Sequence, residues 1–215
     1  NGAVIKTIVS TEMITPICEA YGVEKMDVLT GFKFIGEKIK GFEETGSHQY
    51  LYGFEESYGC LGGTYARDKD AVYAAVLICE MAAYYRSIGS SLKQRMEEIY
   101  AQYGRYLNKT DSYEFPGLAG MDKMAGIKAD LRQNPPAAIG EYKVVKVTDY
   151  KKPEETGLPA ANVLVYDLEG GAQAIVRPSG TEPKIKFYFG VKGESLADSQ
   201  AKLDKLSAET LKMFE

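Results

Sequence analysis

One polar loop near the carboxyl end carries a guanidinium, two hydroxyls and a glycine between two strand-like runs. The planar fork of Arg177 matches two phosphate oxygens. Ser179, Thr181 and the backbone amide of Gly180 can satisfy the remaining oxygens as a nest of donors, and Lys186 adds a point charge from the following strand. We interpret the loop as a phosphate site. The alternative is a capped turn with surface charges, since the pattern is not a P-loop.

A second polar loop follows the run at residues 49–54 and carries Glu55, Glu56 and Ser57. Ligands bind beyond the carboxyl ends of strands in open α/β sheets, and ionised carboxylates accept several O–H bonds at once. Sugar hydroxyls would therefore suit this loop. A divalent metal is the competing ligand, although two carboxylates alone are weak support for it, and solvated acidic residues are the plain alternative.

Two further positions lie where a helix begins. Thr30 and Gly31 end a strand-like run, and a helix cap with a turn glycine explains them equally well. Lys69 precedes a long apolar helix, where the positive field of the helix end is expected to lower its pKa and suit it to proton transfer. The alternative is a surface lysine offset by Asp68 and Asp70.

The first half of the chain alternates strand-like and helical runs. We expect strands at 4–9, 26–29 and 49–54, and helices at 11–21, 32–44 and 68–87. This order is typical of a three-layer α/β domain with a mainly parallel mixed sheet, which we place at residues 1–108. The helix at 68–87 is apolar around most of its circumference, so we expect it to be largely buried. A capping box at Ser91 starts another helix.

The second half changes character, and we interpret residues 109–215 as a linker followed by a small α+β domain with an antiparallel sheet. Residues 109–120 are the expected connection. A helix at 118–132 precedes strands at 142–147, 162–168, 172–177 and 184–191, and Ser195 caps a final helix. Along the last strand Ile185, Phe187 and Phe189 alternate with Lys184 and Lys186, so Lys186 should point away from the core.

Composition excludes several classes of function. The chain of 215 residues has a net charge of -4, which gives no basic footprint for nucleic acid. No apolar run is long enough to span a membrane, and we expect no signal peptide. The three cysteines, Cys18, Cys60 and Cys79, lack metal-ligand spacing, so we expect buried, reduced thiols in a cytoplasmic protein. The single histidine, His48, is expected at the surface and outside any metal site.

The run from 177 to 188, Arg-Pro-Ser-Gly-Thr-Glu-Pro-Lys-Ile-Lys-Phe-Tyr, closely resembles the phosphate-binding loop of the α-D-phosphohexomutase family. In that family the loop belongs to the last of four domains. The resemblance implies phosphate contacts from Arg177, Ser179, Gly180 and Thr181, with Lys186 in support. Some members carry arginine at the position of Lys186, which would add a bidentate option.

The run Gly-Phe-Glu-Glu-Ser-Tyr-Gly, residues 53–59, resembles the sugar-recognition loop in the third domain of phosphoglucomutases. The resemblance implies that Glu55 and Ser57 contact sugar hydroxyls. Phosphomannomutase and phosphoglucosamine mutase relatives usually carry Gly-Glu-x-Ser-Gly-His, and the absence of that histidine here favours a glucose-type enzyme. By the same resemblance Thr30 and Gly31 lie near the sugar.

The segment after this loop also resembles the family. The match implies that Lys69 is a general acid/base and that Arg67 lies on the substrate side. As a whole, the chain resembles the third and fourth domains only. It lacks the family's phosphoserine segment and its Asp-Gly-Asp-x-Asp loop for Mg²⁺.

The resemblance therefore implies a fragment, inactive alone, of a phosphoglucomutase that works through glucose 1,6-bisphosphate. Mg²⁺ and the phosphoserine would come from the missing N-terminal domains of the same polypeptide. A phosphomannomutase or phosphopentomutase fragment and a non-catalytic phosphosugar-binding module stay open as alternatives.

Overall fold

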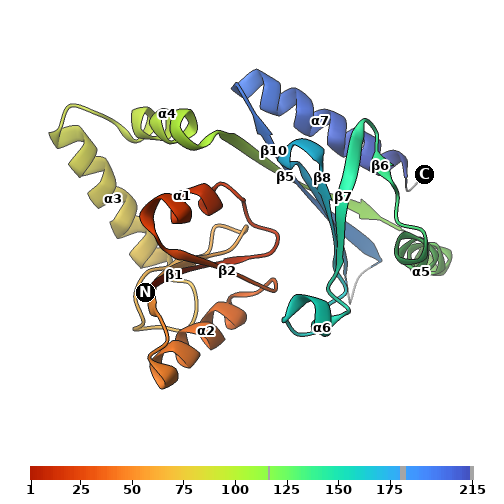
Figure 1. Cartoon of the computed structure of the whole chain (residues 1–215), viewed down its shortest axis with the longest axis horizontal. Coiled ribbons are helices and arrows are strands. Elements are labelled where there is room, and N and C mark those ends of the chain that lie inside the picture. The colour runs from red at the N-terminus through yellow and green to blue at the C-terminus, as the bar shows by residue number, and fades with distance from the viewer. Residues whose placement is uncertain (116, 180–182, 214–215) are drawn as a thin grey trace. The chain divides into compact units, whose positions relative to one another are not determined.

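The computed structural model describes residues 1–115, 117–179 and 183–213. The chain divides into two compact units, Asn1–Gly104 and Arg105–Glu215 (Figure 1). The division falls between a helix and a strand, at Gly104, whose positive φ of 101° ends the last helix of the first unit.

Unit 1 is built on a four-stranded sheet, here sheet A, with the strand order β2-β1-β3-β4. Its successive elements are β1 (Gly2–Thr7), α1 (Ile14–Tyr21), β2 (Glu24–Val28), α2 (Phe32–Thr45), β3 (Gln49–Phe54) and β4 (Cys60–Leu61). The first three strands are parallel, and β4 pairs antiparallel with β3. The prediction of a mainly parallel mixed sheet is confirmed. The short strand β4 was missed because it has only two residues inside a glycine-rich loop.

The two crossover helices cover opposite sides of sheet A (Figure 1). The main core of the unit lies on the α2 side, where Ile35 and Ile39 pack with Ile5, Val28 and Leu61, all almost fully buried. Helix α2 ends at Gly46, whose backbone is left-handed. An L-residue adopts that conformation only with strain.

The long apolar helix α3 (Ala71–Ser87) contradicts its predicted burial, because none of its residues is buried in unit 1. Asp70 caps it by accepting hydrogen bonds from the amides of Val72 and Tyr73. Its exposed apolar surface, here the α3 surface, includes Val72, of which 73% is exposed, and also Val76, Ile78, Met81, Tyr84 and, just beyond the helix, Ile88. The periodicity identified an apolar helix correctly. Its burial is the part of the prediction that was wrong.

Helix α4 (Leu92–Tyr103) follows and begins at the predicted capping residue. The hydroxyl of Ser91 accepts a hydrogen bond from the amide of Gln94 at 3.2 Å. In the described residues no single helix has the length and hydropathy needed to cross a membrane; α3 and α4 reach that length only as a pair bent by 90°.

Unit 2 is a six-stranded antiparallel sheet, here sheet B, with the order β5-β10-β9-β8-β7-β6. Its strands are β5 (Arg105–Glu114), β6 (Ala138–Ile139), β7 (Tyr142–Asp149), β8 (Leu164–Leu168), β9 (Gln173–Pro178) and β10 (Lys184–Gly193). Residues 109–114, predicted as part of a connection, belong instead to β5. Their polar residues misled the prediction because every second side chain of this edge strand faces solvent.

The helices of unit 2 are α5 (Gly117–Gln133), the single turn α6 (Pro153–Thr156) and α7 (Leu196–Lys212). Ser195 caps α7, as predicted, by accepting from the amide of Asp198. Leu203 and Leu206 of α7 pack on the sheet with Phe187 and Phe189, and Met124 and Leu131 of α5 join the same cluster. Sheet B therefore packs one face on helices α5 and α7, while Val165, Ile175 and Tyr188, outside that cluster, are also buried.

The cysteine and histidine expectations hold only in part. The three cysteines are free thiols, of which Cys18 is buried, Cys60 is half-buried and Cys79 is exposed on α3. Cys79 was expected to be buried for the same reason as its helix. His48 is half-buried, packs on the ring of Phe42 and pairs with Glu24 at 2.9 Å.

Candidate functional site

The first group of predicted site residues lies at the carboxyl edge of sheet A. The parallel strands β1, β2 and β3 all end there, and this edge is where open α/β sheets bind ligands. The loop after β3 carries Glu55 and Ser57, and the turn after β2 carries Thr30 and Gly31. One hydrogen bond connects the loop after β3 to the end of β1: the hydroxyl of Thr7 donates to Glu56 Oε2 at 3.0 Å.

Glu55 and Lys69 meet at the base of the β3–β4 loop. The amide of Glu55 donates to the carbonyl of Gly59 at 2.9 Å, which closes the loop. Lys69 Nζ lies 3.6 Å from Glu55 Oε1. Gly59 lies between them: a Cβ there would fall 2.5 Å from Lys69 Cδ and 2.6 Å from Glu55 Oε1. Only glycine therefore leaves room for both side chains.

The surroundings of Lys69 raise its pKa, contrary to the lowering expected from the sequence. Its ammonium hydrogen-bonds Asp68 Oδ1 at 3.2 Å, and the nearby Glu55 carboxylate adds to the effect. The helix begins only after the cap at Asp70, and the raised pKa favours the ammonium form of Lys69.

The β2–α2 turn reaches the same place. Lys69 Nζ lies 5.9 Å from the ring centroid of Phe32, the first residue of α2. Gly31 is the residue before the helix, with φ of 118°, and no side chain caps this end. The hydroxyl of Thr30 is buried and has no hydrogen-bond partner among the described residues. Thr30 is therefore not an ordinary helix cap, and its buried hydroxyl is a group that a ligand could satisfy.

Arg67 has other partners. Its guanidinium donates to the carbonyl of Thr64 at 2.7 Å and forms an ion pair with Glu43 of α2. The structure thus brings Thr30, Gly31, Glu55 and Lys69 to one edge and gives Arg67 a structural ion pair.

A buried lysine beneath the edge was missed from the sequence. Lys6 of β1 is 0% exposed and pairs with Glu12 at 2.7 Å and Asp27 at 2.9 Å. Lys25 pairs with the same two carboxylates. Burial opposes ionisation of Glu12, but the ion pair with Lys6 outweighs it and holds the pKa of Glu12 below its usual value. The signal was available, since a lysine inside an apolar strand must be paired when buried.

The second group of site residues lies on unit 2, on the face of sheet B opposite the packed helices. Arg177 on β9 and Lys186 on β10 are direct register partners. Arg177 Nη1 donates to the hydroxyl of Tyr188 at 3.2 Å. The apolar residues of β10 point into the core, so the prediction that Lys186 points away from it is confirmed.

This pair of cations is electrostatically unusual. Like charges directly opposite each other on neighbouring strands destabilise a sheet, and neither Arg177 nor Lys186 has a carboxylate partner within the described part of the chain. On its other side Lys186 faces Ser112 of β5. A bound anion would relieve the repulsion. Ser179 begins the loop, its amide donating to the carbonyl of Lys184 at 2.8 Å, whereas Gly180 and Thr181 lie outside the described residues.

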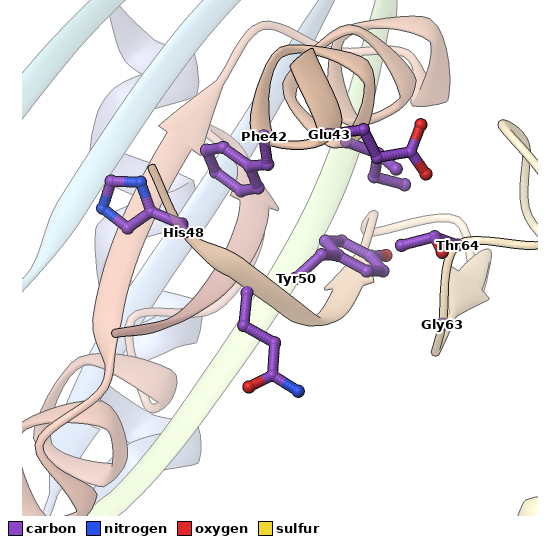
Figure 2. Close-up of a pocket in the computed structure, with 8 residues that line it drawn as sticks. Phe42, Glu43, His48, Tyr50, Gly63 and Thr64 are labelled. Carbon is purple, nitrogen blue, oxygen red and sulfur yellow. The ribbon is translucent and has the colours of Figure 1, made fainter. Parts of the chain in front are cut away.

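A cavity of about 350 Å³ lies elsewhere in unit 1 (Figure 2). It is lined by the end of α2, the start of β3 and Thr64, with Phe42, Glu43, His48 and Tyr50 around it. None of the predicted site residues lines it. In the parts of the chain that the structure describes, no three His, Cys, Asp or Glu side chains cluster as metal ligands.

Comparison with known proteins agrees with this division into two units. The family described as phosphoglucomutase/phosphomannomutase, alpha/beta/alpha domain III, matches residues 1–103. The phosphoglucomutase/phosphomannomutase C-terminal domain matches residues 122–206.

Curated relatives include phosphoglucomutases of Staphylococcus aureus. That of strain MSSA476 is 36% identical over 213 residues, and that of strain MRSA252 is 37% identical. Each match covers 94% of this chain but only 38% of the relative. The chain therefore spans well under half the length of these relatives.

Solved structures show the same fold at lower identity. The parafusin phosphoglucomutase of Paramecium matches with a TM-score of 0.73 and 18% identity, covering 99% of this chain and 37% of that one. A phosphoglucomutase/phosphomannomutase family protein of Burkholderia thailandensis matches with a TM-score of 0.57 and 14% identity, over 98% and 36% of the two chains. The chain belongs to the phosphoglucomutase/phosphomannomutase family and comprises its domain III and its C-terminal domain.

Proposed function

We propose that this chain is the C-terminal part of a phosphoglucomutase that interconverts glucose 1-phosphate and glucose 6-phosphate. The reaction passes through a phosphoserine and a glucose 1,6-bisphosphate intermediate, neither of which this chain supplies. Unit 1 contributes sugar recognition and unit 2 the phosphate clamp. The names of the curated relatives support this activity, and the chain alone is inactive because the phosphoryl-transfer serine lies outside it.

The observation that carries the proposal is the pair Arg177 and Lys186. Two cations held side by side, with no carboxylate partner among the described residues, are adapted to an anion with several oxygens, and phosphate offers both the charge and the geometry. The hydroxyl of Tyr188 orients the guanidinium. Ser179, Gly180 and Thr181 complete the clamp with hydroxyl and amide donors.

The sugar side is assigned to the edge of sheet A. Glu55 and Ser57 bind hydroxyls of the hexose, and Thr30 and Gly31 line the same edge. Lys69 acts as the general acid: its raised pKa keeps it protonated, so it can donate its proton to the sugar oxygen that loses its phosphate to the serine. The amine that remains accepts the proton of the hydroxyl that takes up phosphate in the other half of the reaction. Arg67 keeps a substrate-side role only if ligand binding frees it from Glu43.

The rest of the enzyme would precede this chain. The α3 surface is the docking surface for that preceding part, because an exposed apolar helix of this length is unusual in a free domain and relatives carry more than half of their length beyond this chain. Mg²⁺, which supplies charge stabilisation during phosphoryl transfer, belongs there too, since the described residues offer no ligand cluster for it. A cytoplasmic location fits this carbohydrate-metabolising isomerase.

Two alternatives make different predictions. A phosphomannomutase or phosphopentomutase would prefer another sugar, and the run Glu-Glu-Ser-Tyr-Gly at residues 55–59 argues for glucose. A non-catalytic phosphosugar-binding module would bind glucose 1-phosphate without turning it over.

The test is a mutase assay on the full-length polypeptide, comparing glucose, mannose and pentose 1-phosphates. Lys69→Met should lower kcat by roughly 10²–10⁴-fold with little change in substrate affinity, the usual range for a lost acid catalyst. A change confined to KM would demote Lys69 to a binding residue. A full-length protein that binds phosphosugars but turns none over would contradict the proposed function.

A further inference from the structure

The β3–β4 loop contains a strained tyrosine next to the sugar-binding residues. Tyr58 has φ of 66° and is the non-glycine residue with positive φ in the described chain. A bulky side chain in this region is a genuine outlier, since the left-handed conformation crowds Cβ against the backbone. Such residues persist where function requires them, and they cluster at active sites and ligand clamps.

Nothing in the fold compensates for this strain. The side chain of Tyr58 is 98% exposed, so it contributes no packing. Its hydroxyl makes no hydrogen bond, and its ring contacts no other ring, within the described residues. The bond that closes the loop joins the backbones of Glu55 and Gly59, and glycine at position 58 would preserve it without strain.

The position of Tyr58 explains what the ring can do. It follows Ser57 directly and lies in the same five-residue loop as Glu55, whose carboxylate meets Lys69 at the edge of sheet A. A pyranose has hydroxyls around its rim and apolar C–H groups on its two faces. Carboxylates and hydroxyls can bind the rim but leave the faces unused, whereas a tyrosine offers a large flat surface with few rotatable bonds to fix.

We propose that Tyr58 is a specificity-determining residue whose ring packs against the apolar face of the bound hexose. This rests on the proposed function. Glucose carries only axial hydrogens at ring carbons 2 to 5, so an axial 1-phosphate obstructs one face and the opposite face stays open to an aromatic ring. Mannose carries an axial hydroxyl at carbon 2, which obstructs that opposite face. A face contact also lacks the directionality of a hydrogen bond, so it serves the sugar in both halves of the reaction.

The experiment measures kcat/KM of the full-length enzyme for glucose 1-phosphate and mannose 1-phosphate, together with Tm. Tyr58→Gly should lower kcat/KM for glucose 1-phosphate by about threefold to tenfold, the scale of one aromatic contact, and reduce the preference over mannose. Its Tm should not fall, because the backbone strain is relieved. Tyr58→Phe should behave as the wild type. Tyr21→Ala, which removes another exposed tyrosine of unit 1, should change neither quantity.

Three results would overturn the inference while leaving the proposed function in place. Unchanged kcat/KM and sugar preference in Tyr58→Gly would show that the ring does not touch the sugar. An equal loss in Tyr58→Phe would assign the effect to the hydroxyl instead. A lower Tm in Tyr58→Gly would make Tyr58 a structural residue. A wild-type enzyme inactive on every hexose phosphate would overturn the proposed function and this inference with it.

Discussion

At the scale of single residues, the feature that matters most is how little room surrounds the pair Glu55 and Lys69. Gly59 separates them, and its missing Cβ is what lets the two side chains approach. Catalysis depends on such spacing, because a misplacement of about 1 Å can cost two orders of magnitude in rate. In the proposed function, the pair joins an acceptor for sugar hydroxyls to a proton donor.

Gly59→Ala should therefore damage turnover more than stability. The groups that the new methyl would meet are the ends of two flexible side chains, which can move aside, so we expect less than about 1 kcal/mol of destabilisation. The displacement should lower kcat by roughly tenfold to a hundredfold. The matched control is Gly41→Ala in α2, where nothing lies within 4 Å and a gain of about 0.5–1 kcal/mol is expected. Normal turnover in Gly59→Ala would refute the spacing argument.

The residue scale also shows what the sequence could place. Glu55 and Thr30 follow strands, so they were expected at the carboxyl edge of the parallel sheet, and the structure brings them there together with Lys69. Their roles toward a ligand stay predictions. The direction of the pKa shift at Lys69 was predicted wrongly, because the hydrogen bond to Asp68, its largest cause, and the nearby Glu55 carboxylate were not taken into account. The sequence did not identify Tyr58 as a candidate ligand contact, because the feature that distinguishes it is its positive backbone φ.

At the scale of elements, a buried ion pair of Lys6 joins β1 to its neighbours. Lys6 is enclosed between Glu12, after the strand, and Asp27 on β2. The lowered pKa of Glu12 means that this carboxyl binds its proton less readily in the folded state. Its contribution to stability is therefore present above the unfolded-state pKa and is lost as the pH falls through the folded-state value.

Lys6→Met should destabilise unit 1 by about 3–5 kcal/mol, the usual result of removing one partner from a buried ion pair. The variant should also lose part of the acid sensitivity of the wild type below about pH 4.5, because Glu12 no longer gains from being ionised. Urea denaturation of the full-length protein at pH 7 and pH 4 measures both effects. The exposed pair of Lys40 and Glu44 on α2 supplies the control, since Lys40→Met should cost under about 1 kcal/mol.

For strands β9 and β10, the expected effect of a substitution on stability depends on whether phosphate is bound. Without an anion, Lys186→Gln removes a like-charge contact with Arg177 and should stabilise the protein by a few tenths of a kcal/mol, roughly the value of one cross-strand pair. With 10–100 mM inorganic phosphate, the wild type should gain Tm and the variant should gain less. Thermal denaturation with and without phosphate checks this. An equal phosphate-induced shift in both proteins would show that Lys186 does not take part in the clamp.

Helix α3 shows why an element can be predicted correctly and still be misplaced. Its composition indicates a buried helix, and the helix itself is confirmed at Ala71–Ser87, but unit 1 does not bury it. Strand β5 shows a different error. Its alternating polar residues led to the prediction of a connection, although they belong to an edge strand. Both errors arise where the surroundings of an element, rather than its own residues, decide its burial.

At the scale of the whole molecule, the exposure of α3 predicts an interface with the preceding part of the polypeptide. Val76→Ser in the full-length protein should cost about 1–3 kcal/mol if that surface is covered. The same change should have almost no effect if α3 stays in solvent. Chemical denaturation followed by circular dichroism measures the difference. Glu80→Gln on the same helix is the control, and equal small effects from both substitutions would contradict a covered surface.

The central claim is that unit 1 recognises the sugar and unit 2 holds the phosphate, and ligand binding to the full-length protein tests it most directly. The measurement is calorimetric titration of the wild type, Glu55→Gln and Arg177→Ala with inorganic phosphate and with glucose 1-phosphate. Arg177→Ala should weaken both ligands by about 1–3 kcal/mol, the value of a charge-assisted contact, whereas Glu55→Gln should weaken only glucose 1-phosphate. Unchanged phosphate binding in Arg177→Ala, or equal weakening of phosphate by Glu55→Gln, would contradict the account.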